Sequence, residues 1–389
     1  MKKGNKSFLK ILVLLFVTQG FQVGVWASLI GDLQCNCGMG DKQLGILLVI
    51  QSVSGIFGLL LMILFARKLS KKLILFLGVG GTGIFYGLLS ITKNYDILIF
   101  VFVIGGILMG FLDFIVNRLA GDYEKIYNSK IMLKLHASFS AGTALGALSS
   151  GGLLFLGYSY EFIYIGTGTY LIIVTLINIR NTFPEPAVVG GMELALKRYS
   201  TSFRFEPPVL AAILFMGSTF FIYTAFENYL SIYLRDVMQA DSFLGGIELA
   251  VLYSANMLGR ILGSRIANFI GNYKLLAYSG FICLSGLVLF VFSRNLLSSM
   301  IGLMFVGIGG STFIPLSFYI ANHKSDNPDK AVSLLSGTGY IMLVVSPLLI
   351  GLTAASFGYR VAFLILVIVQ IKIMILIIGK RIFLKGTLD

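Results

Sequence analysis

Long apolar segments separated by short polar stretches dominate this sequence and restrict what it can fold into. A helix needs about 20 residues to cross the hydrocarbon core of a bilayer, and twelve segments reach that length. Helices are the expected form, because unpaired backbone amides are costly in lipid and the segments lack the alternation of barrel strands. We therefore predict an all-α membrane protein with twelve transmembrane helices, over Phe8 to Ile30, Leu44 to Ala66, Leu73 to Thr92, Ile97 to Asn117, Leu133 to Gly157, Phe162 to Ile179, Val209 to Leu234, Phe243 to Ile266, Leu275 to Ser293, Leu296 to Ala321, Ala331 to Phe357 and Tyr359 to Gly379.

The composition excludes a water-soluble fold. Hydrophobic residues make up 57% of the 389 residues and charged residues only 12%, whereas charged residues make up about a quarter of an ordinary soluble domain. So little polar surface cannot cover the core of a soluble protein, and lipid must serve as solvent for much of the chain. The same composition excludes a disordered chain.

The basic residues predict the orientation of the helices. With the N-terminus inside, 25 of the 30 Lys and Arg residues fall on the cytoplasmic side and five on the opposite side. This bias follows the positive-inside rule, so we expect both termini in the cytoplasm and the chain in a bacterial cytoplasmic (inner) membrane. The net charge of +13 then reflects the orientation of the chain in the membrane, and no nucleic-acid partner is expected. Because eleven further spans follow, we expect the first segment to be retained and not cleaved as a secretory signal.

The longest polar interruption, from Arg180 to Pro208, divides the spans six and six. We predict an N-terminal six-helix bundle over residues 1–180, a central cytoplasmic loop over 181–208 and a C-terminal six-helix bundle over 209–389. A shift of 200 residues also superposes Leu44-Gly45 on Leu244-Gly245 and Gly80 on Gly280. This pattern is typical of a transporter built from two parallel repeats, with a substrate site near the membrane midplane between them.

One carboxylate in the first half is a candidate for proton coupling. Asp113 and Asn117 are four residues apart and share a helix face. Asp113 lies within its predicted span, where a charged carboxylate costs at least about 2.5 kcal/mol unless it faces a cavity, finds a partner or is protonated. Burial favours the neutral acid and an aqueous opening favours the ionised one, so alternating exposure would carry a proton. The alternative is a structural role, as a cap or in a pair with Arg118 or His136.

Two further titratable groups have similar alternatives. His136 starts the fifth span near the depth of Asn117 and can titrate with Asp113, or it bonds a backbone carbonyl or faces water. Glu227 lies in Phe226-Glu227-Asn228-Tyr229, whose acid, amide and aromatic groups suit a polyol; it shares its depth with Glu248. The alternatives are that Glu227 pairs with Arg235 and that Glu248 caps its helix.

Polar groups on the first and eighth spans are candidates for solute binding. Gln19, Gln22 and Trp26 are spaced three and four apart and form one stripe on the first helix. Amides and an indole bind sugar hydroxyls and a ring face, although a Trp at this depth also serves as an interfacial anchor. We predict proton coupling at Asp113, His136 and Glu227, and substrate binding at Gln19, Gln22, Trp26, Asn117, Asn228 and Asn256, with Tyr253 and Arg260 as second choices.

Over essentially its whole length the chain resembles the major facilitator superfamily, with twelve spans and a basic central loop. The first loop of that family usually reads Gly-x-x-x-Asp-Arg-x-Gly-Arg-Arg. Here the matching places hold Ile63, Arg67, Lys68, Ser70, Lys71 and Lys72, so the acid that usually provides a conformational latch is absent. The second-half equivalent is Gly259-Arg260-Ile261-Leu262-Gly263-Ser264-Arg265.

Within that superfamily the fourth and fifth spans resemble the fucose/galactose/gluconate proton symporters and related bacterial facilitators. The resemblance rests on Gly110-Phe111-Leu112-Asp113-Phe114-Ile115-Val116-Asn117, on Gly121-Asp122-Tyr123-Glu124 and on His136-Ala137-Ser138-Phe139-Ser140 with Gly142 and Gly146. It implies the major facilitator fold of two six-helix bundles and a proton-coupled carrier for a sugar-like solute, with the fourth-span acid taking the proton. It also implies that the first, fourth and seventh helices line the central cavity.

Signals for catalysis are missing from the sequence. It has no Gly-x-x-x-x-Gly-Lys-Ser/Thr loop and only two histidines, so we expect no enzyme activity, no metal site and no cofactor. We read Cys35, Cys37 and Cys283 as structural, since a one-residue gap gives poor disulfide geometry.

The favoured interpretation is a monomeric secondary active transporter that imports a small polar organic solute, such as a sugar, together with protons by alternating access. The alternative is a proton-driven exporter of drugs, siderophores or other small products, because Gly142, Gly146, Gly151 and Gly152 resemble an exporter motif whose Pro is absent here. The remaining class is a membrane receptor or enzyme with a transporter-like body, and neither an attached domain nor a set of catalytic residues supports it.

Overall fold

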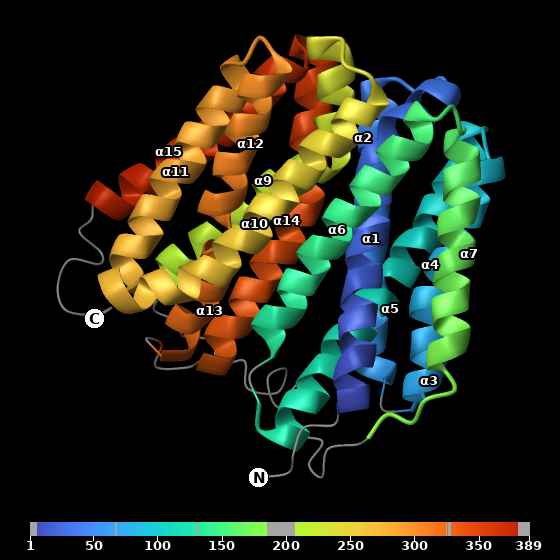
Figure 1. Cartoon of the computed structure of the whole chain (residues 1–389), viewed down its shortest axis with the longest axis horizontal. Helices are drawn as coiled ribbons and strands as arrows, with labels where there is room; N and C mark the ends of the chain where they lie inside the picture. The colour runs from blue at the N-terminus through green and yellow to red at the C-terminus, as the bar shows by residue number, and fades with distance from the viewer. Residues whose placement is uncertain are drawn as a thin grey trace. The chain divides into compact units, whose positions relative to one another are not determined.

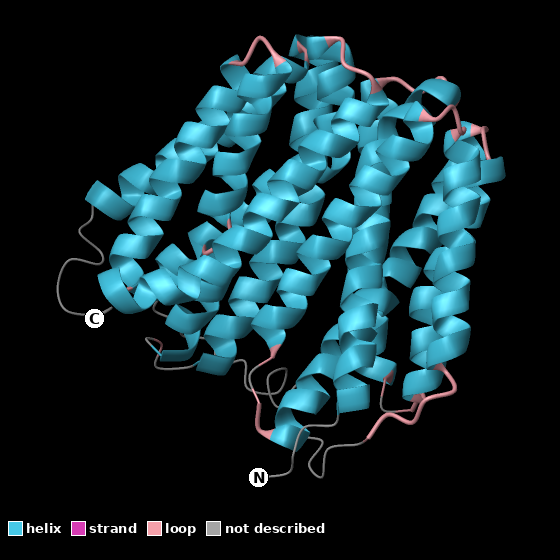
Figure 2. Cartoon of the chain, viewed as in Figure 1, coloured by secondary structure: helices cyan, strands magenta, loops and turns pink. Residues whose placement is uncertain are grey.

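The computed structural model describes residues 6–66, 68–129, 131–184, 207–323, 325 and 328–379. Within these ranges the regular elements are helices, with no strand (Figure 2). The all-α class is therefore confirmed. Arg67 of the first loop motif and most of the predicted central loop lie outside the described residues.

The helices of the first half follow the predicted apolar segments. Their bounds are α1 (Lys6–Asn36), α2 (Asp41–Phe65), α3 (Lys71–Leu75), the π-helical η1 (Phe76–Gly80), α4 (Gly81–Ile91), α5 (Tyr95–Tyr127), α6 (Met132–Phe155) and α7 (Tyr160–Asn178). The third predicted span is thus composite, because α3, η1 and α4 follow one another without a loop.

The second half is helical in the same way. Its helices are α9 (Pro207–Met238), α10 (Ser242–Ile270), α11 (Asn272–Phe292), α12 (Leu296–Gly310), α13 (Phe313–His323), α14 (Pro328–Phe357) and α15 (Tyr359–Gly379). Among the described residues, nine helical stretches are long and apolar enough to cross a membrane. The helices α6, α10 and α15 occupy the other three predicted segments, and the total of twelve spans stays a prediction.

Contacts divide the chain into two compact units. Unit 1 comprises Met1–Val189, Asn228–Arg235 and Ala240–Ala250; unit 2 comprises Gly190–Glu227, Asp236–Gln239 and Val251–Asp389. Parts of α9 and α10 therefore belong to unit 1 by their contacts. The division at the central loop stays a prediction.

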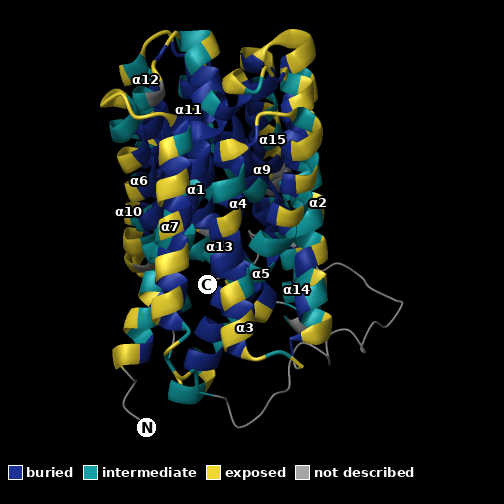
Figure 3. Ribbon diagram, turned by 90° about the vertical axis from the view of Figure 1, so that its right-hand side faces the viewer, coloured by how far each residue is buried: buried dark blue, intermediate teal, exposed yellow. Residues whose placement is uncertain are grey.

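The exposed side chains are those expected of a protein in lipid. On α7, Phe162, Ile165, Ile173 and Leu176 are about half-exposed and recur at helical spacing, so they form one outward stripe. The yellow residues along α7 in Figure 3 mark this face. Soluble proteins rarely expose such a continuous apolar surface, whereas lipid tails cover it without cost.

Glycines bring two helix pairs of unit 1 into close contact. The first pair is α1 and α6, which run side by side (Figure 1). A Cβ on Gly20 would lie 2.0 Å from the Phe139 carbonyl oxygen, and one on Gly142 would lie 2.2 Å from the Val17 oxygen. Only small residues allow backbones to approach so closely, and this is a common way to pack helices in membranes.

The second pair is α2 and α5, which pack by the same device. A Cβ on Gly106 would lie 2.3 Å from the Gln51 carbonyl oxygen, and one on Gly110 would lie 2.2 Å from the Gly55 oxygen. The small-residue strip of α5 therefore fixes the helix that carries Asp113.

We predict that Gly142→Ala destabilises the protein by about 1–3 kcal/mol, the usual cost of overpacking a tight interior. Gly152→Ala is the matched control, because it lies on the same helix and its Cβ would meet nothing within 4 Å. Thermal unfolding in detergent measures the effect. Equal melting temperatures for the two variants would contradict the close contact of α1 with α6.

Candidate functional site

The predicted coupling acid lies in a hydrogen-bonded cluster of unit 1. The side chain of Asp113 is half-buried on α5, and its Oδ1 accepts hydrogen bonds from Gln19 Nε2 of α1 at 3.2 Å and from Asn117 Nδ2 at 3.0 Å. Asn117 Nδ2 also donates to the Asp113 carbonyl oxygen at 2.9 Å. Helical spacing predicts the Asn117 contact, whereas the contact with Gln19 joins two residues that are 94 positions apart in the sequence.

The neighbours of this cluster bear on the structural alternatives. Arg118 donates to the Ala66 carbonyl oxygen at 3.2 Å, and its guanidinium lies 5.9 Å from the centre of the Phe114 ring. The ring of His136 meets that of Phe16 edge-on at 5.6 Å. A coupled titration of His136 with Asp113 stays a prediction.

Gln22 is engaged inside unit 1 with a residue that the sequence analysis did not single out. The Tyr86 hydroxyl of α4 lies 2.7 Å from the Gln22 carbonyl oxygen and 2.9 Å from its Oε1. Both side chains are buried. Gln19, Gln22 and Trp26 therefore share one face of α1, but each of the three side chains binds a different partner.

Trp26 also has a specific partner in unit 1. Its indole Nε1 donates to Asn228 Oδ1 at 3.0 Å, and its ring lies 5.8 Å from that of Phe102 and 6.3 Å from that of Phe85. Only 6% of the Trp26 surface is exposed. A buried, hydrogen-bonded indole does not fit the alternative of an interfacial anchor, whose ring lies among lipid headgroups.

A second polar cluster lies in unit 2 and joins α9 to α10. The Tyr253 hydroxyl donates to Glu227 Oε1, and Asn256 Nδ2 donates to the Tyr223 hydroxyl and, at 3.4 Å, to the Gly307 carbonyl oxygen. The rings of Tyr223 and Tyr253 lie 5.9 Å apart. The sequence analysis did not name Tyr223, although its spacing of four residues from Glu227 placed it on the same helix face.

Arg235, the alternative partner of Glu227, has contacts at the end of α1. Arg235 Nη1 lies 2.9 Å from the Gly31 carbonyl oxygen and 2.7 Å from Cys35 Sγ, and Nη2 lies 3.2 Å from Gln34 Oε1. Arg235 therefore binds the end of α1.

A buried ion pair stands near the degenerate first-loop motif. Lys71 Nζ of α3 lies 2.9 Å from Asp122 Oδ2 of α5, and the two side chains are 5% and 10% exposed. The same Nζ donates to the Pro184 carbonyl oxygen at 2.8 Å. Removing one partner of such a pair would leave an unpaired charge in the protein interior. Lys71 therefore links α3, α5 and the chain after α7, although the first-loop motif lacks its usual acid.

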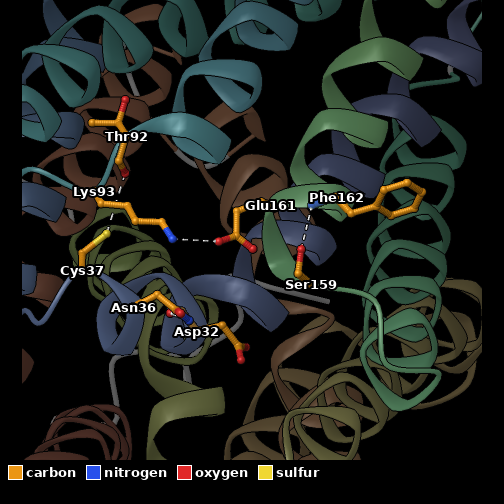
Figure 4. A network of polar contacts seen from close by, with 8 residues as sticks. All are labelled: Asp32, Asn36, Cys37, Thr92, Lys93, Ser159, Glu161 and Phe162. Carbon is orange, nitrogen blue, oxygen red and sulfur yellow. Dashed lines mark hydrogen bonds and ion pairs between the residues drawn. The ribbon is translucent and has the colours of Figure 1, made fainter.

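A polar network lies at the end of unit 1 where α1 finishes and α7 begins, which we call the distal end (Figure 4). Lys93 Nζ lies 3.3 Å from Glu161 Oε1. Cys37 Sγ lies 3.8 Å from the Thr92 carbonyl oxygen, and Asn36 Nδ2 donates to the Asp32 backbone carbonyl oxygen at 2.9 Å. All three cysteines are free.

We predict that Cys37 reacts slowly with maleimide in a Cys35→Ala variant. Burial raises the pKa of the Cys37 thiol above its ordinary value of 9.0, and Lys93 partly offsets this effect while Glu161 adds to it. Because the thiolate is the reactive form, the labelling rate should still be rising above pH 9.0. Lys93→Gln should raise the pKa further; a rate that levels off below pH 9.0 would contradict the burial.

We predict that phospholipids brominated on their acyl chains or headgroups quench Trp26 weakly, because the indole is buried in protein. The chain has a single Trp, so its fluorescence reports on this position alone. Trp26→Phe combined with Phe162→Trp is the control, since Phe162 is 54% exposed and should be quenched strongly. Equal quenching of the two proteins would restore the anchor interpretation.

Comparison with known proteins identifies the family. The family model of the Major Facilitator Superfamily matches residues 11–328. An uncharacterized MFS-type transporter of Yersinia pestis is 25% identical over 358 residues, which cover 90% of this chain and 90% of that protein. A multi-drug resistance efflux pump, PmrA, of Streptococcus pneumoniae is 23% identical over 346 residues, 84% of each chain.

The fold agrees with this match. A bacterial homolog of the human lysosomal transporter Spinster, solved in an inward-facing and occupied conformation, superposes with a TM-score of 0.76 at 15% identity. The superposition covers 99% of this chain and 100% of that one. The chain is an integral membrane protein and belongs to the Major Facilitator Superfamily of transporters.

Proposed function

We propose that this transporter imports a small polar organic solute, of the size and polarity of a sugar, together with a proton carried by Asp113. The observation that carries the proposal is the hydrogen-bonded cluster of Gln19, Asp113 and Asn117 on α1 and α5. The sequence resemblance to the sugar and sugar-acid proton symporters supports the same assignment. The proposal includes a bacterial inner membrane location with both termini in the cytoplasm, as the basic residues predict.

The cluster suits a carboxylate that changes its protonation state. An ionised carboxylate in a span is costly, and the amide hydrogens of Gln19 and Asn117 offset part of that cost by donating to one of its oxygens. A proton on Asp113 removes the negative charge and weakens both hydrogen bonds. The two amides then become available to other acceptors.

This exchange of partners links proton binding to solute binding. Released amides of Gln19 and Asn117 match the hydroxyl groups of a polyol, which both donate and accept hydrogen bonds. A solute that binds the protonated cluster more tightly raises its affinity for the proton by the same factor, because the coupling free energy is reciprocal. Proton and solute are thereby carried together.

The cluster of unit 2 supplies further groups of the same kind. Glu227, Tyr253, Asn256 and Tyr223 combine a carboxylate, an amide and two phenols, and they form two hydrogen-bonded pairs, Tyr253 with Glu227 and Asn256 with Tyr223. We assign Glu227 a role in proton coupling and Asn256 one in solute binding. Trp26 and Asn228 complete the set of binding residues in unit 1.

Proton-driven export is the second candidate function, and one observation favours it. The relative from Streptococcus pneumoniae is a multi-drug resistance efflux pump, and it aligns with 84% of this chain. The same carboxylate chemistry serves exchange if the solute binds the ionised cluster and not the protonated one. The direction of solute movement under an imposed proton gradient separates import from export.

We predict that Asp113→Asn abolishes uphill accumulation of solute in proteoliposomes with an alkaline interior and keeps solute counterflow at zero gradient. Asparagine retains the hydrogen-bonding shape of the site but takes no proton. The control is Asp96→Asn, on the first turn of the same helix and exposed, which should accumulate solute like the wild type. Accumulation that survives Asp113→Asn would refute the proton assignment, and expulsion of solute by the wild type under the same gradient would establish export.

A further inference from the structure

The face of α10 that points away from lipid carries an arginine. Tyr253, Asn256 and Arg260 are spaced three and four residues apart and therefore share one face of the helix. The opposite face holds side chains that are about half-exposed, as expected beside lipid: Leu258 (51%), Ile261 (47%) and Leu262 (48%). Arg260 is itself half-buried, so its accessible part lies on the side away from these apolar residues. A guanidinium within a predicted span is costly, and such a residue usually marks the path or the binding site of a polar solute.

An interrupted helix belongs to the same unit. The helix α12 ends at Gly310 and α13 begins at Phe313, although Leu296–His323 is one stretch long and apolar enough to cross a membrane (Figure 1). The first backbone N–H groups of a helix have no partners within that helix, and they carry the positive end of its dipole. In transporters, the start of such a half-helix is a common place for an anionic group of the solute.

Glycines of α10 hold the interruption against this helix. A Cβ on Gly263 would lie 3.0 Å from Thr312 Cγ2, and a Cβ on Gly259 would collide with the side chain of Ser311. Arg260 lies between these two glycines in the sequence and, at 100° per residue, about 60° around the helix from Gly263. The arginine and the interruption therefore belong to one region of unit 2.

The Tyr223 hydroxyl adjoins both of them. A Cβ on Gly310, the last residue of α12, would lie 2.9 Å from the Tyr223 hydroxyl oxygen. The hydroxyls of Tyr223 and Tyr253 are electrostatic neighbours of Arg260. Asn256 Nδ2 donates to the Tyr223 hydroxyl as well. Arg260 and the start of α13 thus border the polar cluster of unit 2.

Thr312, in the interruption, has a side-chain hydroxyl without a hydrogen-bond partner among the described residues. Only 5% of Thr312 is exposed, and an unsatisfied hydroxyl in such a place costs about 1–3 kcal/mol. The Thr312 carbonyl oxygen accepts a hydrogen bond from Leu316 N at 3.0 Å, so Thr312 takes the N-cap position of α13. An N-cap threonine usually binds the N–H of the second or third helical residue, and the third is Pro315, which has no N–H. Independently of Arg260, this unused hydroxyl indicates a ligand with hydrogen-bonding groups.

We propose that Arg260, Thr312 and the start of α13 bind the carboxylate of the transported solute, which is then a small organic acid and not a neutral sugar. A guanidinium presents paired N–H groups that match the two oxygens of a carboxylate. The Thr312 hydroxyl and the first N–H groups of α13 donate to its remaining lone pairs. One guanidinium balances one negative charge, which favours a carboxylate over a phosphate of nearly two charges. The inference deepens the proposed function and rests on it for the statement that the bound acid is transported.

Modification of arginine by phenylglyoxal tests the site in the full-length protein in nanodiscs, with acetate as the probe. Acetate presents a carboxylate alone, and acetamide is its neutral counterpart of the same shape. We expect acetate to slow the modification of Arg260, followed by peptide mass spectrometry, and acetamide with sodium chloride at equal ionic strength to leave it unchanged. Arg265, which is exposed on the same helix, is the internal control and should react at the same rate in both solutions.

Thr312→Val removes the hydroxyl and keeps the shape of the side chain. This variant should need about ten times more acetate for the same protection of Arg260, which corresponds to ~1.4 kcal/mol. Undiminished protection together with a higher melting temperature would identify a dry, unsatisfied hydroxyl and overturn the role of Thr312. Equal protection by acetate and acetamide would overturn the carboxylate site, and so would an Arg260 that does not react at all.

The probe experiment uses no proton gradient, so it separates this inference from the proposed function. Protection of Arg260 by acetate would stand even if Asp113→Asn still accumulated solute, and then only the proton assignment would fail. If acetate gives no protection, the carboxylate site is refuted, while proton-coupled import of a neutral solute is still judged by the Asp113→Asn experiment.

Discussion

Lipid offers no hydrogen bonds, and this constraint determines where the polar side chains of the chain lie. Each polar group within a span must find its partner in the protein or remain at a cost. Gln19 therefore binds Asp113, and Trp26 binds Asn228, in pairs whose members are 94 and 202 residues apart. The residues proposed to act in transport are thus held in position by the same hydrogen bonds that lower their cost in the membrane.

Glycine packing determines which face of α1 is left for these contacts. Gly20 and Gly142 place α1 against α6 at distances that admit no side chain. Gln22 lies about 200° around the helix from Gly20, at 100° per residue, and so turns toward α4, where it meets Tyr86. The close contact of α1 with α6 and the polar contacts of α1 with α4 and α5 are therefore two consequences of one arrangement of residues.

Length and hydropathy predicted the helices, because the width of a bilayer leaves few alternatives for an apolar segment. Helical spacing also predicted the contact of Asn117 with Asp113. It did not predict that Gln19 would bind Asp113 or that Tyr86 would bind Gln22, since those contacts depend on how helices pack. Tyr223 was missed for a related reason, because a tyrosine in an apolar run resembles any core aromatic until its hydroxyl is seen beside Asn256.

The same constraint bears on the buried hydroxyl of Tyr164 by a different argument. The chain uses 32 Phe and 18 Tyr residues, so an aromatic ring without a hydroxyl is freely available to it. At a dry buried position Phe fills the space of Tyr and avoids the cost of an unsatisfied hydroxyl. At Tyr164 the chain keeps a hydroxyl that is fully buried and has no hydrogen-bond partner among the described residues, so its cost is retained in the interior of unit 1.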